Sequence, residues 1–392
     1  MSIPKQSKEL RNMMENLFYE EKVGISWVTK FENNFSKKFD SRYSIAVNSG
    51  TSGLHAALLA GGIGKGDEVI QPAITVIMDS YVTLHVGAKP VFVDVDKDTW
   101  NMDPLKIEEL ITENTKAIIT VSIYGLPVNI TKIMDIAKKY NLLVIDDSAE
   151  TFLSRYEGKL YSNKADLTVY SFERSKHMTS GSEGGMVTTN NEKLAQRVRQ
   201  FAGIGYRGLK ASAGRTSLAS EVYQDPNYER FDEIGFNYRM NAVTAAFGNA
   251  QLEILDNLVE KRKKIGGLFL EAIKGCKWMT PQKVDKSITH TYFTFGVVYE
   301  GEKHKGIKWK DFYNQYLEKG GDGFYACWKN PYLEPSLKNK KFGTQKWDIG
   351  LCKNAEILQK KIMAFKTNYK DINLAKRKIS ILSDLIDQIG RE

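Results

Sequence analysis

The sequence has few of the features that mark disulfide-rich, zinc-binding or membrane-spanning proteins. Its three cysteines, Cys276, Cys327 and Cys352, are far apart and form no CxxC or CxxH pair, so we expect buried or half-buried free thiols and no metal site. No run approaches the roughly 20 uncharged apolar residues that a membrane span needs. The first residues lack the apolar core of a signal peptide, so we expect a cytoplasmic protein.

A concentration of one charge is also missing. The formal net charge of +9 is spread along the 392 residues, although lysines alternate with aromatic and acidic residues in the last third. Nucleic-acid binding would require these charges on one face, together with stacking aromatic rings. We therefore expect a solvated surface and no nucleic-acid or membrane partner, with attraction of a phosphorylated substrate as the alternative.

What is present is an alternation of short apolar runs and helical segments. β-Branched runs such as SIAVNSG, KPVFVDVD, KAIITVSIYG and NLLVIDDSA are separated by segments with helical spacing. This order predicts an α/β fold with a mostly parallel sheet covered by helices. A long helical stretch replaces the alternation after Met240. We expect a large domain over residues 1–250, with a helical segment at its start, and a smaller α/β domain over residues 251–392.

The stretch NSGTSGLHAAL, residues 48–58, joins a strand to a helix through small residues. Backbone N–H groups of Gly50, Thr51 and Ser52 would lie at the helix N-terminus, where unpaired amides and the helix dipole favour an anion such as phosphate. Serine and threonine at a helix start are also ordinary caps. The stretch alone leaves both a phosphate site and a simple cap open.

The stretch VIDDSAET, residues 144–151, is an apolar strand that ends in two carboxylates. Because side chains alternate along a strand, Asp146 and Asp147 lie on opposite faces and at most one points to a given ligand. Ligands of such sheets bind at the carboxyl ends of the strands. A carboxylate there could hold a metal, act as a base, pair with a protonated heterocyclic nitrogen or cap a helix.

The stretch YSFERSKHMTSGSEGG, residues 170–185, places Ser171 and Lys176 just past another apolar strand. Its glycines allow the backbone to approach a ligand closely. A lysine amine, a carboxylate and a phosphate-binding turn are the three parts that pyridoxal phosphate requires: they bond its aldehyde, keep its ring nitrogen protonated and neutralise its phosphate. Most lysines are solvated surface charges, so only the order and spacing of the three parts indicate this cofactor.

These stretches, together with GAKPVFVDVDKDTWNMDP and IGFNYRMNAVTAAFGNAQLEIL, resemble the DegT/DnrJ/EryC1/StrS aminotransferases from about Gly24 to the C-terminus. The resemblance implies a fold-type-I transferase with a seven-stranded type of sheet that uses pyridoxal phosphate (PLP) and its aminated form (PMP). It also implies transfer of an amino group from glutamate or glutamine to a keto sugar. The sugar would be nucleotide-linked, in surface-glycan or related amino-sugar biosynthesis.

The resemblance assigns catalytic roles to two of these residues and a cofactor contact to a third. Lys176 would form the Schiff base with the cofactor and then, once displaced by the donor, act as the general base. Asp147 would pair with the pyridine nitrogen and stabilise negative charge developing on the donor. Glu150 falls where the family has Gln or Glu near the 3-hydroxyl of the cofactor.

The resemblance also implies how the phosphate is held. Gly50, Thr51 and Ser171 would bind it, with Ser52 beside them in the same turn. Asn237, in GFNYRM, falls where the family sends an asparagine into the phosphate site of the neighbouring subunit. Activity would therefore require a homodimer with a shared active site.

Two departures from the family pattern bear on the site. Val76 stands where the family commonly has an aromatic residue stacked on the cofactor ring, so ring contact would come from a smaller face or another residue. The spacing to EGG is one residue longer than in many members, so alignment from the glycines puts His177 at the lysine position, as in the related deoxysugar dehydratases. Alignment from Ser171 selects Lys176, which we expect, with His177 packing beside the lysine or contacting substrate.

The long polar segment 206–231 is a surface loop or part of the substrate pocket. The resemblance places it near the pocket, where Tyr206, Arg207 or Arg215 would contact a phosphate or a sugar hydroxyl. Three other histidines, His55, His85 and His290, lie in a helix or in apolar runs and are expected to be structural. A PLP- or PMP-dependent dehydratase, and an aminotransferase for a keto-cyclitol or a small phosphorylated ketone, remain alternatives.

Overall fold

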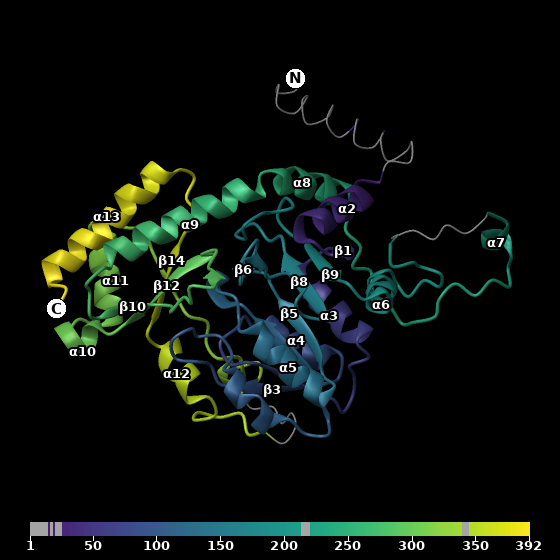
Figure 1. Cartoon of the computed structure of the whole chain (residues 1–392), viewed down its shortest axis with the longest axis horizontal. Helices are drawn as coiled ribbons and strands as arrows, with labels where there is room; N and C mark the ends of the chain where they lie inside the picture. The colour runs from purple at the N-terminus through teal and green to yellow at the C-terminus, as the bar shows by residue number, and fades with distance from the viewer. Residues whose placement is uncertain (1–14, 16–18, 20–25, 213–219, 339–344) are drawn as a thin grey trace.

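A computed structural model of the chain describes residues 26–212, 220–338 and 345–392, together with Glu15 and Tyr19. Within these ranges a large sheet forms the centre of the molecule, and a smaller sheet with two long helices lies beside it (Figure 1). The helices α9 and α13 run along the outside of the smaller sheet. The arrangement is the α/β fold that the alternation of segments predicts.

The central sheet has seven strands in the order β1-β9-β8-β5-β4-β2-β3. β9 runs antiparallel to β8 and β1, and the remaining neighbours are parallel, which confirms the predicted mostly parallel sheet. The register sets Asp147 beside Val121 and Val169, so the carboxyl ends of β4, β5 and β8 lie near one another. The strands are β1 (Tyr43–Val47), β2 (Glu68–Pro72), β3 (Lys89–Val93), β4 (Thr115–Val121), β5 (Leu143–Asp147), β8 (Leu167–Ser171) and β9 (Gly185–Thr189).

In the described part of the chain, six helices accompany this sheet. Most begin at a side-chain cap, as α2 does, where Ser26 Oγ accepts from the Thr29 amide at 3.3 Å. Helix α2 buries Phe31, Phe35 and Phe39 at four-residue spacing against Tyr170. The helices are α2 (Trp27–Phe39), α3 (Gly50–Ala60), α4 (Met78–His85), α5 (Ile130–Tyr140), α6 (Glu192–Ala202) and α8 (Ala242–Glu253).

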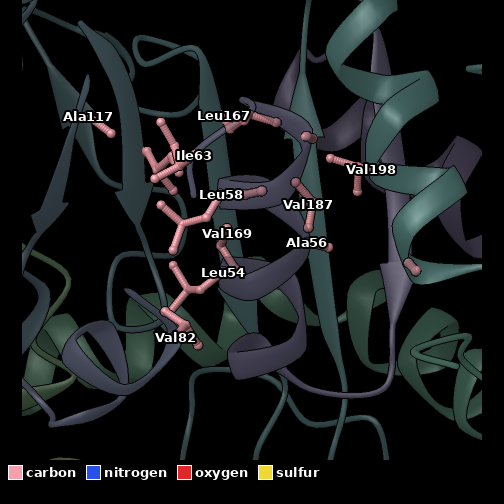
Figure 2. Packing of buried hydrophobic residues seen from close by; sticks show 14 of the residues in the cluster. Leu54, Ala56, Leu58, Ile63, Val82, Ala117, Leu167, Val169, Val187 and Val198 are labelled. Atoms are coloured by element: carbon pink, nitrogen blue, oxygen red, sulfur yellow. The ribbon is translucent and has the colours of Figure 1, made fainter. Parts of the chain in front are cut away.

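Helix α3 lies directly on the sheet. Leu54 and Leu58 belong to the buried cluster in Figure 2, and burial of each such side chain contributes about 1.5–3 kcal/mol. Gly53 allows this close approach, because a Cβ there would lie 2.9 Å from Val169 Cγ1 and 3.1 Å from Val187 Cγ2. The packing sets the start of α3 at the carboxyl end of β1.

The second sheet has four antiparallel strands in the order β10-β12-β14-β13. Phe269 of α9 and Leu382 of α13 are buried against its face. The elements are β10 (Met279–Pro281), β12 (Thr294–Tyr299), β13 (Tyr325–Ala326), β14 (Ile362–Lys366), α9 (Leu255–Ala272), α10 (Gly301–Lys305), α11 (Trp309–Glu318), α12 (Lys353–Gln359) and α13 (Ile372–Ile389).

Short elements complete the fold. A small sheet in the order β11-β6-β7 joins residues 155–160 to residues 288–289. These elements are β6 (Arg155–Tyr156), β7 (Lys159–Leu160), β11 (Ile288–Thr289), α7 (Ser220–Gln224) and the 3₁₀ turns η1 (Pro104–Lys106), η2 (Glu108–Leu110), η3 (Ile123–Gly125) and η4 (Pro331–Leu333).

The chain after residue 324 returns to the large sheet. Gln345 hydrogen-bonds the main chain of Phe92 in edge strand β3, at 2.9 Å to its amide and 3.0 Å to its carbonyl. Asn330 Nδ2 donates to Ala73 O at 2.8 Å. These contacts cover an edge that would otherwise be open to pairing with another strand. The division at residue 250 stays a prediction, and α8 passes into α9 at Ile254.

Cys276, Cys327 and Cys352 are free and buried, as predicted. Across residues 26–212, 220–338 and 345–392, no helix has the length and apolar character that crossing a membrane requires.

Candidate active site

The carboxyl ends of three strands bring the three predicted stretches together. β1 leads into α3 at Gly50, β5 ends at Asp147 and β8 ends at Ser171. Such edges are the usual ligand sites of mostly parallel sheets. The chain order of the site is therefore turn, carboxylate and lysine, and the fold makes them neighbours.

The turn before α3 and the end of β8 form a tight cradle. A Cβ on Gly50 would lie 2.9 Å from Ser171 Cβ and 3.4 Å from Ser171 Oγ, and a Cβ on Gly185 would lie 2.8 Å from Gly50 N. Ser49 is the N-cap, and its Oγ accepts from the Ser52 amide at 3.0 Å. The Ser52 amide is therefore already occupied by the cap, and Gly50 and Thr51 present the amides at the start of the helix.

Lys176 lies in the turn between β8 and β9. Its side chain is only 14% exposed, and Nζ lies 3.4 Å from Glu150 Oε1 and 4.4 Å from the centre of the Phe293 ring. The other carboxylate oxygen of Glu150 accepts from the Tyr124 amide at 2.8 Å. Lys176 is thus a buried, oriented amine rather than a solvated surface charge.

The two adjacent aspartates have different surroundings. Asp146 is 2% exposed, and its carboxylate accepts from three hydroxyls, those of Thr120, Ser148 and Tyr161. Asp147 is half-buried and accepts only the Ala149 amide on Oδ1, at 2.9 Å. Among the described residues nothing donates to Asp147 Oδ2. Asp146 is a satisfied structural group, and Asp147 has an oxygen free to accept from a ligand.

The electrostatics of Asp147 favour a cationic partner. Burial raises the pKa of this carboxyl from 3.8 to about 7, while the Ala149 amide and Lys176 oppose the shift. A carboxylate that is costly to ionise alone is stabilised when a positive group binds to it. A protonated heterocyclic nitrogen would provide that group.

A second buried carboxylate, Asp79, was not predicted from the sequence. It is 1% exposed in the first turn of α4, with Oδ2 accepting from the Thr75 hydroxyl and Oδ1 unpartnered within the described part of the chain. Burial, and then the proximity of Asp147, hold the pKa of Asp79 well above its usual range. The one available signal was an acidic residue inside the apolar run ITVIMDSYV.

The sequence profile of the DegT/DnrJ/EryC1/StrS aminotransferase family matches residues 5–354. The chain belongs to this family. It is 37% identical over 273 residues, 70% of each chain, to the GDP-perosamine synthase of Escherichia coli O157:H7. It is 34% identical over 254 residues to the UDP-2-acetamido-2-deoxy-3-oxo-D-glucuronate aminotransferase of Pseudomonas aeruginosa, covering 65% of this chain and 66% of that one.

The fold agrees with the family. The solved aminotransferase from Psychrobacter cryohalolentis superposes with a TM-score of 0.83 at 26% identity, covering 99% of this chain and 97% of that one. The protein is a fold-type-I aminotransferase, and its cofactor is pyridoxal phosphate. The residues at the sheet edge fit this group: a cradle that a Cβ would fill, a buried amine and a free carboxylate oxygen.

His177, beside the lysine of the aminotransferase, is packed rather than open. It is 3% exposed, its Nε2 lies 3.1 Å from Thr291 O, and its ring contacts Phe152 and Phe293. Burial, and then Arg262, hold its pKa well below the usual range. Of the two roles expected for His177, the geometry corresponds to packing and not to substrate contact.

Val76 and Asn237 lie where the strands end. Val76 is half-buried in the turn between β2 and α4. The carbonyl of Asn237 accepts from Asn48 Nδ2 at 3.4 Å, close to the turn that begins α3, and Asn237 is exposed. Whether Asn237 completes the site of a neighbouring subunit stays a prediction.

The segment that follows α6 is held by its own contacts. Tyr206 stacks on Phe231 with ring centres 4.9 Å apart, and Arg207 pairs with Asp232 at 2.7 Å and Glu229 at 2.9 Å. The structure brings Tyr206 and Arg207 together with residues 229–232 rather than with Lys176. Arg215 lies outside the described residues, and the substrate role of all three stays a prediction.

Of the three histidines expected to be structural, His55 and His290 are buried and hydrogen-bonded, whereas His85 is exposed at the end of α4. His55 Nδ1 lies 2.9 Å from the Tyr238 hydroxyl, and burial lowers its pKa to about 4. His290 accepts from the Tyr292 amide at 2.9 Å and lies 3.2 Å from Gln282 Oε1. Sequence reasoning missed Phe293 and Arg262, because both lie more than 80 residues after the lysine and carry no motif.

Proposed function

We propose that this aminotransferase moves an amino group from glutamate or glutamine to a nucleotide-linked keto sugar in amino-sugar or surface-glycan biosynthesis. The observation that carries the catalytic assignment is the buried Lys176 amine, 3.4 Å from Glu150 Oε1 at the edge where Asp147 keeps a free oxygen. The nucleotide-linked acceptor is supported by the GDP- and UDP-sugar names of two relatives.

The cofactor would be held by residues from all three stretches. Gly50, Thr51 and Ser171 would bind its phosphate through amides and a hydroxyl, because the cradle is positive at the helix start. Asp147 would accept from its ring nitrogen. Glu150 would lie beside its ring oxygen, since Glu150 is already hydrogen-bonded to Lys176. Val76 would face the ring.

Lys176 would perform the proton transfers. When bound, pyridoxal phosphate supplies an aldehyde that takes up the amino group and a ring that withdraws electrons. The Lys176 amine would hold that aldehyde in the resting enzyme and, once released, move the proton at the donor α-carbon. Asp147, as a carboxylate paired with the ring nitrogen, would stabilise the negative charge that develops at that carbon.

A homodimer would complete the site. Six large apolar side chains between residues 231 and 254 are exposed, a group that a monomer rarely leaves open. They are Phe231, Ile234, Phe236, Val243, Phe247 and Ile254. Phe247 Cγ lies 3.8 Å from the position of a Cβ on Gly181, in the lysine turn, so this surface reaches the site. Asn237 lies within the same segment and would be carried to the neighbouring subunit.

The position of α7 (Ser220–Gln224) also supports association of two copies. The described residues around it project from the body beyond α6 in Figure 1. A segment that extends this far can reach a second copy. The polar residues of the segment would then contact phosphate or sugar groups in the partner's site.

Absorbance spectroscopy tests the lysine assignment. Wild-type protein with pyridoxal phosphate should show the band of the lysine-bound cofactor, and glutamate or glutamine should remove it. Lys176→Ala should never show the band, whereas Lys116→Ala, at an exposed strand position, should behave as wild type. A band that persists in Lys176→Ala would contradict the assignment, and no band in the wild type would favour the dehydratase.

The acceptor is tested separately. The enzyme is first treated with the amino donor, so that its cofactor carries the amino group. It is then mixed with GDP-linked or UDP-linked keto sugars, and the amino-sugar product is followed by mass spectrometry. Return of the lysine-bound band together with an amino sugar supports the proposal. Return of the band only with a keto-cyclitol or a small phosphorylated ketone would contradict the acceptor class and leave the role of Lys176 unchanged.

A further inference from the structure

Arg262 is a buried cation that belongs to no part of the site described so far. It lies in the middle of α9 and is 5% exposed. Its guanidinium makes four hydrogen bonds, from Nη2 to Ser175 O at 2.6 Å and Lys176 O at 2.8 Å, and from Nη1 to Phe293 O at 2.8 Å and Thr367 Oγ1 at 3.3 Å. Two of the four partners are the main chain of the lysine and of the residue before it.

These contacts join three segments that are distant in the sequence. Ser175 and Lys176 lie in the turn between β8 and β9, Phe293 directly precedes β12, and Thr367 directly follows β14. Thr367 Oγ1 also lies 2.6 Å from Tyr292 O and 2.9 Å from Phe293 O. A displacement of the small-domain strands would therefore be transmitted through Arg262 to the main chain of Lys176.

Arg262 also sets the surface on which the lysine amine rests. The Phe293 ring centre is 5.4 Å from Arg262 Cζ and 4.4 Å from Lys176 Nζ. Both cations thus contact the same aromatic ring, an attractive arrangement for each. The guanidinium fixes the main chain beneath Lys176 and the ring beside its amine.

A packing role alone does not explain a charge at this position. No described carboxylate lies within 4.0 Å of the guanidinium, in contrast to Arg199, which pairs with Glu32 at 2.8 Å. Burial lowers the pKa of Arg262 to about 10, and the more distant Glu150 opposes the shift. An unpaired buried charge is costly, and an apolar side chain would fill the space without that cost.

We propose that Arg262 is a positioning residue that holds Lys176 and Phe293 in the arrangement in which the lysine amine meets the aldehyde of the cofactor. It does so by tying the lysine turn to two strands of the small domain. The planar fork of arginine suits four acceptors on two sides, which the compact ammonium of lysine cannot match. The inference rests on the proposed role of Lys176.

The test compares Arg262→Lys with Arg199→Lys. Both remove a guanidinium that is nearly fully buried and bonded to main-chain carbonyls, but Arg199 contacts Ala211 O and Ser44 O, away from the lysine turn. Two quantities are measured on the full-length protein. The first is the rate at which the cofactor-free protein forms its covalent bond to added pyridoxal phosphate, and the second is the visible circular dichroism of the holoenzyme. Borohydride reduction and peptide mass spectrometry identify the bonded lysine.

Arg262→Lys should attach the cofactor covalently about 10- to 100-fold more slowly than Arg199→Lys, because a small displacement of a reacting group slows its reaction by a factor of this size. Its visible circular dichroism should change while that of Arg199→Lys stays as in wild type. Rates within twofold of each other, with equal circular dichroism, would overturn the inference.

A second variant covers loss of folding in Arg262→Lys. Thr367→Val keeps every charge and removes one of the four acceptors of the guanidinium. It should slow covalent attachment of the cofactor by about threefold or more, because Lys176 is displaced less than in Arg262→Lys. A folded Thr367→Val protein with the wild-type rate would overturn the inference. Labelling of a lysine other than Lys176 in the wild type would instead overturn the proposed function.

Discussion

At the scale of single residues, the site depends on which face of a strand each carboxylate occupies. Asp146 and Asp147 are chemically identical neighbours in β5, yet three hydroxyls surround Asp146 and one amide contacts Asp147. Strand alternation separates them, and only Asp147 keeps an oxygen for a ligand. The cost of leaving that carboxylate without a cation should appear in the stability of the cofactor-free protein.

We expect Asp147→Asn to stabilise the cofactor-free protein more at pH 8 than at pH 5. The folded-state pKa of about 7 lies above the ordinary 3.8, so the folded state binds the proton more tightly than the unfolded chain. Wild-type stability therefore falls as pH rises through this window and stays low above it. The difference between variant and wild type should grow by about 1–2 kcal/mol, less than the full shift because Asp147 is half-buried.

Urea unfolding of both proteins at the two pH values measures this difference. Asp135→Asn, on the exposed face of α5, is the control and should show no such growth. With pyridoxal phosphate added, the wild type should gain more stability than Asp147→Asn, because the ring nitrogen pairs with the carboxylate. A difference that is the same at pH 5 and pH 8 would show that Asp147 titrates normally.

At the scale of elements, the start of α3 is closely constrained by its neighbours. The helix is pressed onto β8 and β9 through Gly53, and its first residue meets the end of β8. The turn is therefore a junction of one helix and two strands, so the small residues in NSGTSG serve the packing as well as the proposed phosphate site.

We expect Gly50→Ala to lose about 1–3 kcal/mol of stability, because the added Cβ would lie 2.9 Å from Ser171 Cβ. Cofactor affinity should fall about tenfold or more as the turn moves, the equivalent of ~1.4 kcal/mol. Thermal unfolding and a fluorescence titration with pyridoxal phosphate measure the two effects.

Gly267→Ala is the matched control. Gly267 lies inside α9, and a Cβ there meets nothing within 4 Å, so the change should add about 0.5–1 kcal/mol through helix propensity. Cofactor affinity should be unchanged. If Gly50→Ala binds pyridoxal phosphate as tightly as Gly267→Ala does, the turn is not the phosphate site.

At the scale of the whole molecule, the prediction concerns the exposed apolar side chains between residues 231 and 254. Ile234 is 91% exposed, and Phe247, which is 48% exposed, lies next to the turn that carries the lysine. Leu105, in η1, is 82% exposed and lies outside this segment.

We expect Ile234→Lys combined with Phe247→Lys to convert the protein from dimer to monomer. Placing two charges in an apolar interface should weaken association by on the order of 2 kcal/mol or more. Leu105→Lys should remain a dimer. Sedimentation velocity gives the masses, and weaker cofactor binding by the monomer would support a contribution of Asn237 across the interface; a monomeric wild type would contradict the proposal.

The fold class and the approximate place of the site could be predicted from the sequence alone. β-Branched runs of strand length and helical spacing between them predicted the mostly parallel sheet, and local turns marked Gly50, Asp147 and Lys176 at its carboxyl edge. These features are readable because periodicity and turn chemistry are local. The family resemblance added the cofactor and the reaction.

Only the tertiary structure decided how these residues are supported. In the folded protein, hydrogen bonds occupy both oxygens of Asp146, whereas one oxygen of Asp147 has no donor among the described residues. Asp79 is buried nearby, the Ser52 amide is bonded to the helix cap, and His177 is packed in the interior. The tertiary structure also joined Lys176 to Arg262, Phe293 and Thr367, which come from three later elements. Contacts over such separations depend on how elements distant in the sequence pack, and no local pattern in the chain encodes that.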